Sequence, residues 1–194
     1  MSSDVGTAVR IADTIDFLSE IARAQAAAGE VDFERLAAGY VDLRRTLARE
    51  FRTLAQQSLL SNEPALEITR RRIEHRMQEL FGGRVPDKYL AVKGYKGVHP
   101  ILLQYLLKHF GEPVAASRLR VLTGDQVHTE RRLRELRDLG YELSWKRVFD
   151  EDHYVLASTE PNLEWATLFQ VEHNIKNDRS ISSETKAGYL AFLD

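Results

Sequence analysis

Residues 126–141 constrain the fold of this chain more than any other part of its sequence. Leu133, Leu136 and Leu139 recur at steps of three and form one apolar face, which is typical of a helix packed on a core. Gly140 follows as a helix stop. The remaining faces are polar and rich in arginine, so the segment predicts a helix with one buried side and one cationic side.

The elements on either side of this helix predict a winged helix-turn-helix. An apolar helix is expected over residues 101–110, and a short helix is expected to start near Ala116. After the arginine-rich helix we expect a strand over 141–145, a charged tip at 150–152 and a second strand over 153–157. Helix, short helix, longer helix and hairpin is the winged-helix order, so this module is predicted over residues 98–160.

The rest of the chain is predicted to be helical, which makes the expected fold mainly α. Residues 1–83 predict an N-terminal helical bundle, 84–97 a basic connector, and 161–194 two C-terminal helices. The first of these two helices is expected to be capped by Asn162 and the second by Ser182 or Ser183. The second helix of the bundle carries an apolar seam that suits packing on another helix, either within the bundle or in a homodimer. That seam consists of Leu36, Tyr40, Leu43, Leu47, Phe51 and Leu54.

Composition excludes several classes of protein. The 194 residues include no cysteine, so disulfides, zinc–thiolate sites and cysteine nucleophiles are excluded, and a cytoplasmic location is expected. Neither a signal peptide nor a membrane-spanning apolar run is predicted. The formal net charge is -2, so any binding of nucleic acid has to rest on local positive charge. Residues 118–147 supply such an excess, with eight Lys or Arg against five Asp or Glu.

The cationic helix and its neighbours supply candidate contacts to double-stranded DNA. Arginine can grip guanine O6 and N7 as a fork, and glutamine can pair with adenine. The predicted contacts to bases or to nearby backbone are Gln126, His128, Thr129, Arg131 and Arg134. The predicted contacts to phosphate are Arg118, Arg120 and Lys146. A second phosphate contact is predicted on the third helix at Arg70, Arg71 and Arg72, and the alternative for that run is a solvated face.

Two observations oppose the DNA interpretation and keep a second one open. Arginine and glutamate at helical spacing often form an ion-paired face, and Glu130 and Glu135 are placed to pair with Arg134 and Arg131. The predicted wing tip at 150–152 is acidic and would repel phosphate. The alternative function is a structural adaptor whose winged helix binds a protein partner in a larger complex, such as a defence complex.

The sequence Arg-Arg-Leu-Arg-Glu-Leu at 131–136, the Gly140-Tyr141 turn and the Tyr154-Val155-Leu156 strand together resemble a known module. It is the winged-helix DNA-binding module fused to some bacterial restriction endonucleases, including HNH-type enzymes. The resemblance covers only the predicted winged helix. It implies sequence-specific DNA binding in a restriction, phage-defence or transcription-regulation setting. The cutting activity of the family is not carried over to this chain, because the nuclease motif is absent.

No catalytic, cofactor or metal site is predicted. The six histidines show no metal-binding spacing, and neither a P-loop nor a G-x-G-x-x-G motif occurs. The expected function is therefore non-catalytic, unless the chain is the regulatory part of a longer enzyme.

Overall fold

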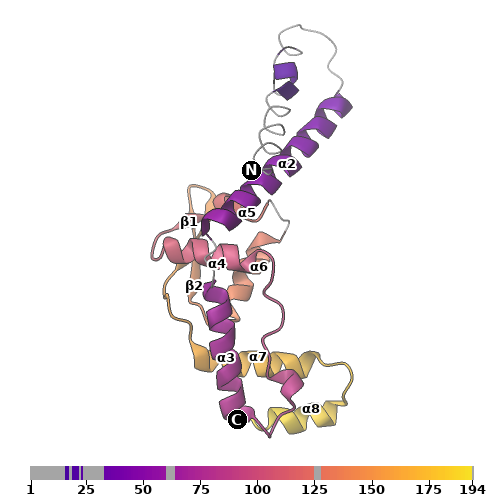
Figure 1. Ribbon diagram of the computed structural model, residues 1–194, viewed down its shortest axis with the longest axis vertical. Helices are drawn as coiled ribbons and strands as arrows, with labels where there is room; N and C mark the ends of the chain where they lie inside the picture. The colour runs from indigo at the N-terminus through magenta and orange to yellow at the C-terminus, as the bar shows by residue number, and fades with distance from the viewer. Residues whose placement is uncertain are drawn as a thin grey trace.

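The computed structural model describes residues 16–17, 19–21, 23, 33–59, 64–124 and 128–193. Most of the first predicted helix lies outside these ranges, and so does Gln126. The described part is mainly helical with one small antiparallel sheet, as predicted (Figure 1). Its elements are α2 (Phe33–Leu59), α3 (Ala65–Phe81), η1 (Asp87–Tyr89), α4 (His99–Lys108), β1 (Val114–Ala115), α5 (Ala116–Leu122), α6 (Thr129–Arg137), β2 (Leu143–Val148), β3 (Glu151–Leu156), α7 (Leu163–Asn177) and α8 (Ser183–Leu190).

The sheet has the strand order β1-β3-β2, and both pairings are antiparallel. The hairpin turns at Phe149 and Asp150, which both have positive φ (49° and 62°) and close a two-residue loop. Glu151 and Asp152 therefore lie in β3, whereas the sequence placed them at the tip. Strand β1 was not predicted, because its two residues are too few to show an alternating pattern.

The core between α4, α5, α6 and the sheet is built from the predicted leucines. Leu133, Leu136 and Leu139 are at most 1% exposed. They join Leu102 of α4 and Leu119 of α5, which are also fully buried, in one apolar cluster. Each such leucine contributes about 1.5–3 kcal/mol of burial free energy, so this face fixes α6 firmly on the body.

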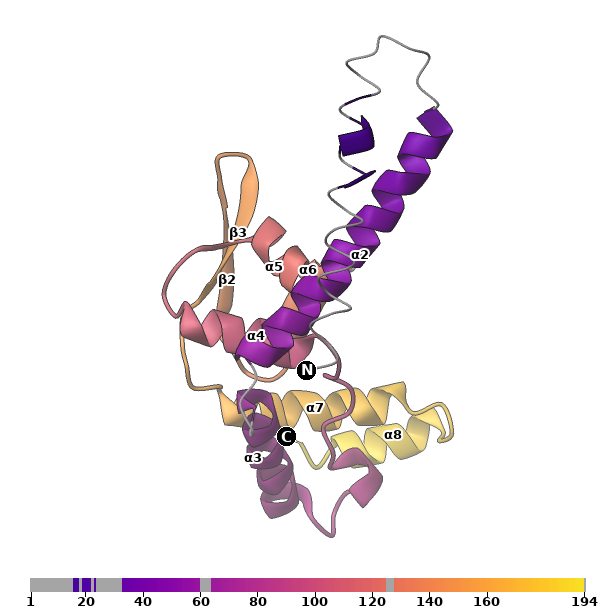
Figure 2. The same cartoon turned by 45° about the horizontal axis from the view of Figure 1, so that its top comes forward.

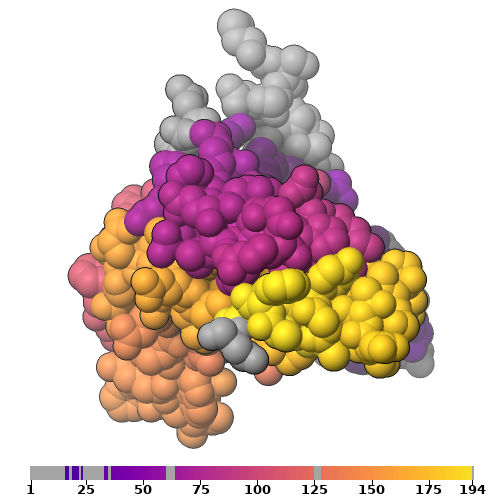
Figure 3. Space-filling view, turned by 90° about the horizontal axis from the view of Figure 1, so that it is seen from below, coloured from indigo at the N-terminus to yellow at the C-terminus, as the bar shows by residue number. Residues whose placement is uncertain are grey.

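The helices α2 and α3 pack on later elements. Helix α3 lies mainly on α7 and α4, and α2 lies on α5 and α4. This differs from the predicted N-terminal bundle, because the buried face of α3, with Ile73 and Met77, joins the same core as Val171 of α7. Seen from below, α3 and the α7–α8 pair form one continuous surface (Figure 3).

The predicted connector at 84–97 is packed into this core. Val85, Tyr89, Leu90 and Val92 are each at most 3% exposed. The amide nitrogen of Asn174 donates to the carbonyls of residues 89 and 91 at 2.9 and 2.8 Å, which satisfies their backbone. Glycines and a proline interrupt these residues, so their buried side chains follow no period that a sequence pattern could show.

The end of α6 is joined tightly to the start of α7. Gly140 has φ +85°, and a Cβ atom there would lie 2.4 Å from the carbonyl oxygen of Asn162. The Asn162 amide donates to the Gly140 carbonyl at 2.8 Å, and the Asn162 side chain accepts from the backbone amide of Trp165 at 3.1 Å. Asn162 thus caps α7, as predicted, while it also holds the end of α6. Ser182 caps α8 in the same way, as predicted.

Helix α2 projects beyond the body (Figure 1). Its 27 residues span about 40 Å, and only its C-terminal half reaches α4 and α5. The β2–β3 hairpin stands on the other side of α5 from α2 (Figure 2). In the part of the chain that the structure describes, no helix combines the length and the apolar character needed to cross a bilayer.

Candidate nucleic-acid interface

The outer face of α6 carries two exposed arginines, Arg131 and Arg134. His128 is also exposed and occupies the N-cap position of this helix. Arg134 lies on the side of α6 that faces the hairpin, because its charge acts on Tyr154 of β3. It forms no ion pair with any described residue. The structure therefore brings His128, Arg131 and Arg134 to one end and one face of α6.

Glu135 organises the other side of α6. Its carboxylate accepts from Nε of Arg131 at 2.9 Å, from Nη1 of Arg132 at 2.9 Å and contacts Nε2 of His99 at 2.8 Å. Burial opposes the charged form of Glu135, but hydrogen bonds from Arg132, His99 and Arg131 outweigh it and hold its pKa below the ordinary value. The predicted pairing of Glu135 with Arg131 is confirmed. The bond uses Nε of Arg131 and leaves its two terminal nitrogens for another acceptor.

His99 connects this carboxylate to the preceding segment. The ring is 2% exposed, and its Nδ1 lies 2.9 Å from the carbonyl oxygen of Lys96. The two ring nitrogens thus lie between the Lys96 carbonyl and the Glu135 carboxylate and hold the ring in place. The ring of His99 thus connects the backbone of the exposed Lys96 to the carboxylate that holds Arg131 and Arg132.

Glu130 pairs with Arg120 of α5, whereas the sequence suggested Arg134. Nε of Arg120 donates to Glu130 at 2.6 Å. Arg118 is exposed as well, but it lies two residues before Arg120 and therefore about 160° away around the helix. The structure thus places Arg120 next to α6 and Arg118 on a different side of α5.

Thr129 faces the core. It is 1% exposed, and its hydroxyl lies 2.8 Å from that of Thr123. The Thr123 hydroxyl also donates to the carbonyl of Arg120 at 2.9 Å. This buried hydrogen bond holds the start of α6 against the end of α5. Thr129 therefore stabilises the packing of the two helices. The sequence did not show this, because the direction of the side chain depends on the residue at which α6 begins.

The hairpin presents aromatic side chains that the sequence argument did not assign to the site. Trp145 is 60% exposed and pairs across the strands with Tyr154, on the sheet face that turns toward Arg134. Phe149 at the tip is 99% exposed. Lys146 is exposed too, but it pairs with His153 on the opposite face of the sheet.

The acidic residues expected at the wing tip are largely engaged within the chain. Glu151 accepts from the backbone amide of Ser117 at 2.9 Å and so satisfies the start of α5. Arg147 lies 3.8 Å from carboxylate oxygens of both Asp150 and Asp152. Only Asp150 therefore projects fully into solvent, and the repulsion of phosphate is weaker than the sequence suggested.

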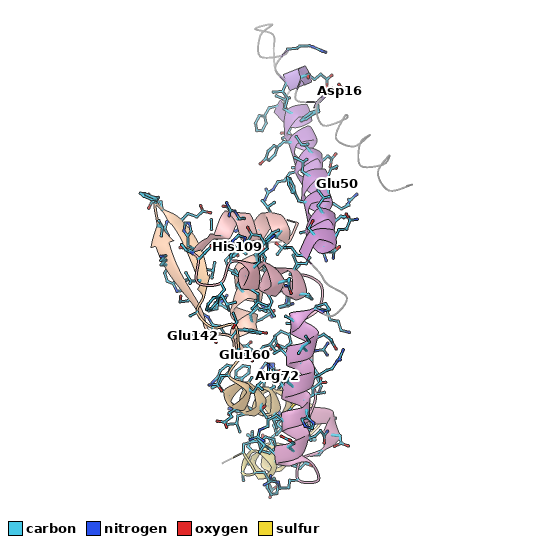
Figure 4. All side chains as sticks on the ribbon, turned by 60° about the vertical axis from the view of Figure 1, so that its left-hand side comes forward. Asp16, Glu50, Arg72, His109, Glu142 and Glu160 are labelled. Atoms are coloured by element: carbon cyan, nitrogen blue, oxygen red, sulfur yellow. The ribbon has the colours of Figure 1, made fainter. Side chains whose placement is uncertain are left out.

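The arginine run on α3 is placed away from α6, on a helix that packs on α7 and α4. Arg70 donates to Glu67 at 3.1 Å and to the carbonyl of Val92 at 3.0 Å, with its side chain 22% exposed. Arg72 donates to Glu160 at 2.8 Å (Figure 4). Arg71 is exposed. Two of the three guanidinium groups thus link α3 to other segments of the body.

A known protein family covers the part of the chain that carries this interface. Residues 101–157 match the KpnI N-terminal domain. The matched span runs from the first turn of α4 to the end of the β2–β3 hairpin, so it includes α6 entirely. The match ties the chain to a domain associated with restriction endonucleases. No curated protein and no solved structure matches the chain. Within the described ranges, no three His, Asp or Glu side chains gather as ligands for a metal ion.

Proposed function

We propose that this protein binds double-stranded DNA at specific sequences through a winged helix formed by α4 to β3, without catalysis, in a restriction-related setting. The order helix, strand, helix, helix, hairpin supports the winged-helix assignment, and α6 then takes the position of the recognition helix in the major groove. The observation that carries the proposal is the outer face of α6. There Arg134 is exposed, has no ion-pair partner among the described residues and acts on Tyr154, the cross-strand neighbour of the exposed Trp145.

The arginines of α6 would have different roles in this complex. Arg134 can extend into the groove as a fork onto guanine O6 and N7. Arg131 is already oriented by Glu135 through Nε, so its terminal nitrogens can reach a base with little loss of side-chain freedom. His128 at the helix start adds a donor to base or phosphate. Gln126 lies outside the described residues and stays a prediction.

Contacts to phosphate would lie on both sides of α6. Lys96 flanks the helix next to Glu135, and Arg120 flanks it through its bond to Glu130. Such contacts fix the orientation on the duplex and make the affinity depend on salt. Arg118 and Lys146 point to other sides and would contribute to the general attraction of DNA instead.

A salt-series titration of labelled duplexes tests the proposal, with the preferred sequence first selected from a random pool. Arg134→Ala is expected to weaken binding to the selected site by roughly 5- to 100-fold, which corresponds to about 1–3 kcal/mol for one specific base contact. Lys96→Ala is expected to weaken all duplexes alike and to reduce the salt slope by about one. Arg72→Ala on α3 is the matched control and should leave affinity unchanged. If the wild-type chain binds no duplex at low salt, the proposal is wrong.

The hairpin favours a second candidate, an adaptor that docks on a protein partner. Phe149 is 99% exposed and has φ 49°, a conformation that costs a bulky residue free energy and suits asparagine or glycine. Neither packing nor the turn therefore explains a phenylalanine here. Trp145 is a second exposed aromatic side chain of the hairpin, and aromatic residues are enriched in protein interfaces.

One substitution separates the two candidates. Phe149→Asn fits the turn and is expected to keep or raise the melting temperature. An adaptor loses its partner after this change, which quantitative co-purification of wild type and variant from the native cell would show. DNA binding through α6 instead responds to Arg134→Ala and is insensitive to Phe149→Asn.

A further inference from the structure

Helix α2 carries a stripe of apolar side chains that the described residues leave open. Phe33 is 73% exposed, Tyr40 58%, Phe51 50% and Leu54 52%. Leu36, Leu43 and Leu47 lie between them and are half-buried. Successive members of the stripe are three or four residues apart, so they share one side of the helix along its whole length.

From Tyr40 to Phe51, this stripe forms one wall of a groove. The opposite wall is the outer side of α5, with Ser117, Arg120 and Val121. Tyr40, Leu47 and Phe51 are among the α2 residues that line it, and its volume is about 470 Å³. The first turns of α2, before Tyr40, extend beyond the body (Figure 2). The later turns of the helix thus line a groove, and the first turns form a projecting apolar ridge.

We propose that a second copy of this chain covers the stripe, with the two α2 helices antiparallel about a two-fold axis. In that arrangement the projecting half of each α2 lies in the α2–α5 groove of the other. A two-fold interface uses the same surface patch on both copies, and this patch contains both the ridge and the groove that receives it. The interaction uses neither α6 nor the hairpin. Of the proposed DNA contacts, Arg120 of α5 also lines this groove.

The spacing of the stripe supports the antiparallel direction. Reversing the helix about the point between residues 43 and 44 places Phe33 opposite Leu54, Leu36 opposite Phe51, and Tyr40 opposite Leu47. Six of the seven stripe residues then meet another apolar residue in a layer, and Leu43 lies next to the axis opposite Arg44. In a parallel pair, both grooves would lie at the same end of the helix pair. Neither projecting ridge would then meet the groove of the other copy.

The exposed area is also of the size that a dimer needs. A large aromatic side chain carries about 150–250 Å² of surface, so the half-exposed members of the stripe together expose on the order of 400 Å². The half-buried leucines and the wall at Val121 add to this. The stripe and this wall thus supply a large part of the roughly 800 Å² that one partner buries in a standard interface. A contiguous apolar patch of this extent is often a functional surface.

Phe17 contacts α2 to one side of the stripe. A Cβ atom on Gly39 would lie 2.1 Å from the ring of Phe17, so these two residues touch. Gly39 is one residue before Tyr40 and therefore about 100° away around the helix. The residues preceding α2 are the competing cover for the stripe, and the test below distinguishes that outcome.

The mass in solution tests the proposal on the full chain. Light scattering across a concentration series is expected to give twice the chain mass for the wild type. Tyr40→Glu and Phe51→Glu, both at half-exposed positions, are expected to give the single-chain mass with an unchanged circular-dichroism spectrum. Ala38→Glu is the matched control, because it adds the same charge at an exposed position on the far side of α2 and should leave the dimer intact. A monomeric wild type, with Tyr40→Glu lowering the melting temperature, would instead assign the stripe to the chain's own N-terminal residues and overturn the proposal.

Cross-linking then tests the direction, and the absence of natural cysteine makes single-cysteine variants unambiguous. Mixed Phe33→Cys and Leu54→Cys chains are expected to form a disulfide-linked dimer on oxidation, whereas Phe33→Cys alone is not. Efficient cross-linking of Phe33→Cys with itself would show a parallel pair and contradict the proposed arrangement. A dimer that binds no DNA would leave this inference standing and reject only the proposed function.

Discussion

Helices α3 and α6 each carry four arginines, and they use them in opposite ways. On α3, Arg70, Arg72 and Arg76 each bond to a separate carboxylate, and Arg70 also bonds to a backbone carbonyl. On α6, the single carboxylate of Glu135 holds Arg131 and Arg132, and Arg134 stays open. The number of arginines is therefore a poor guide to an interface. Whether an arginine is available to bind a partner depends on how many hydrogen-bond acceptors the fold places within its reach.

The largest effect is expected for Arg70→Met, which tests whether α3 uses its arginines for stability. The substitution removes the donor to the Val92 carbonyl and leaves Glu67 without its partner in a partly buried position. The free energy of unfolding should fall by about 2 kcal/mol, because an unsatisfied buried acceptor costs more than a surface ion pair. Urea unfolding measures this. If the folded Arg70→Met variant also lost about 2 kcal/mol of DNA-binding free energy, α3 would contribute to DNA binding as well as to stability, and the two helices would not differ in this respect.

A somewhat smaller effect is expected for Glu135→Gln, which releases the two arginines of α6. The change weakens three hydrogen bonds and should lower the free energy of unfolding by about 1–2 kcal/mol. Affinity for DNA should rise, because the removal of a negative charge from beside Arg131 is expected to outweigh the loss of its orientation. Titration of the same duplex with wild type and variant checks the sign. Weaker binding by the variant would mean that the orientation of Arg131 matters more than the charge.

The same carboxylate predicts how stability depends on pH. The pKa of Glu135 in the folded state lies below its ordinary value of 4.5, so the folded protein binds this proton less readily than the unfolded chain. The stability it contributes is therefore complete above pH 4.5 and is lost as the pH falls through the lower folded value. Unfolding curves measured at descending pH should show a steeper loss for wild type than for Glu135→Gln. Parallel curves would contradict the proposed role of Glu135 as the centre of this network.

A small effect is expected for Arg72→Ala. Its ion pair with Glu160 joins α3 to the segment before α7, but both side chains are largely exposed (43% and 72%). Exposed pairs contribute about 0–1 kcal/mol, and salt weakens them further. Thermal unfolding at low and high salt should differ slightly for wild type and not for the variant. A loss as large as that for Arg70→Met would show that the pair holds the two segments together.

The smallest effect is expected for Arg76→Gln, whose pair with Glu79 lies on the solvent side of α3. Neither unfolding nor DNA affinity should change measurably. A clear loss of DNA affinity here would assign α3 to the interface after all and remove the distinction from α6.

Local patterns in the sequence predicted the helices of the body well. The leucine spacing of α6, the capping residues Asn162 and Ser182 and the order of helices before the hairpin are confirmed, because each depends on neighbours within a few residues. The buried connector, the pairing of Arg120 with Glu130 and the bond from Glu151 to α5 were not predicted. Each of these depends on contacts between residues that only the folded chain brings together.

The same limit applies to the candidate site. Arg131 and Arg134 could be chosen from the helical wheel, but the burial of Thr129 depends on where α6 begins. Lys96 and Trp145 join the site only through His99 and the strand register. No pattern of residue types around them indicated this.

The joint at Gly140 has a consequence for protein engineering. Because the end of α6 and the start of α7 share hydrogen bonds and leave no room for a Cβ atom, the two helices keep a fixed mutual angle. A fluorophore or an effector module attached rigidly to α7 would therefore stay at a constant distance and direction from α6. In such a fusion, the geometry would be set by the protein and not by the length of a linker.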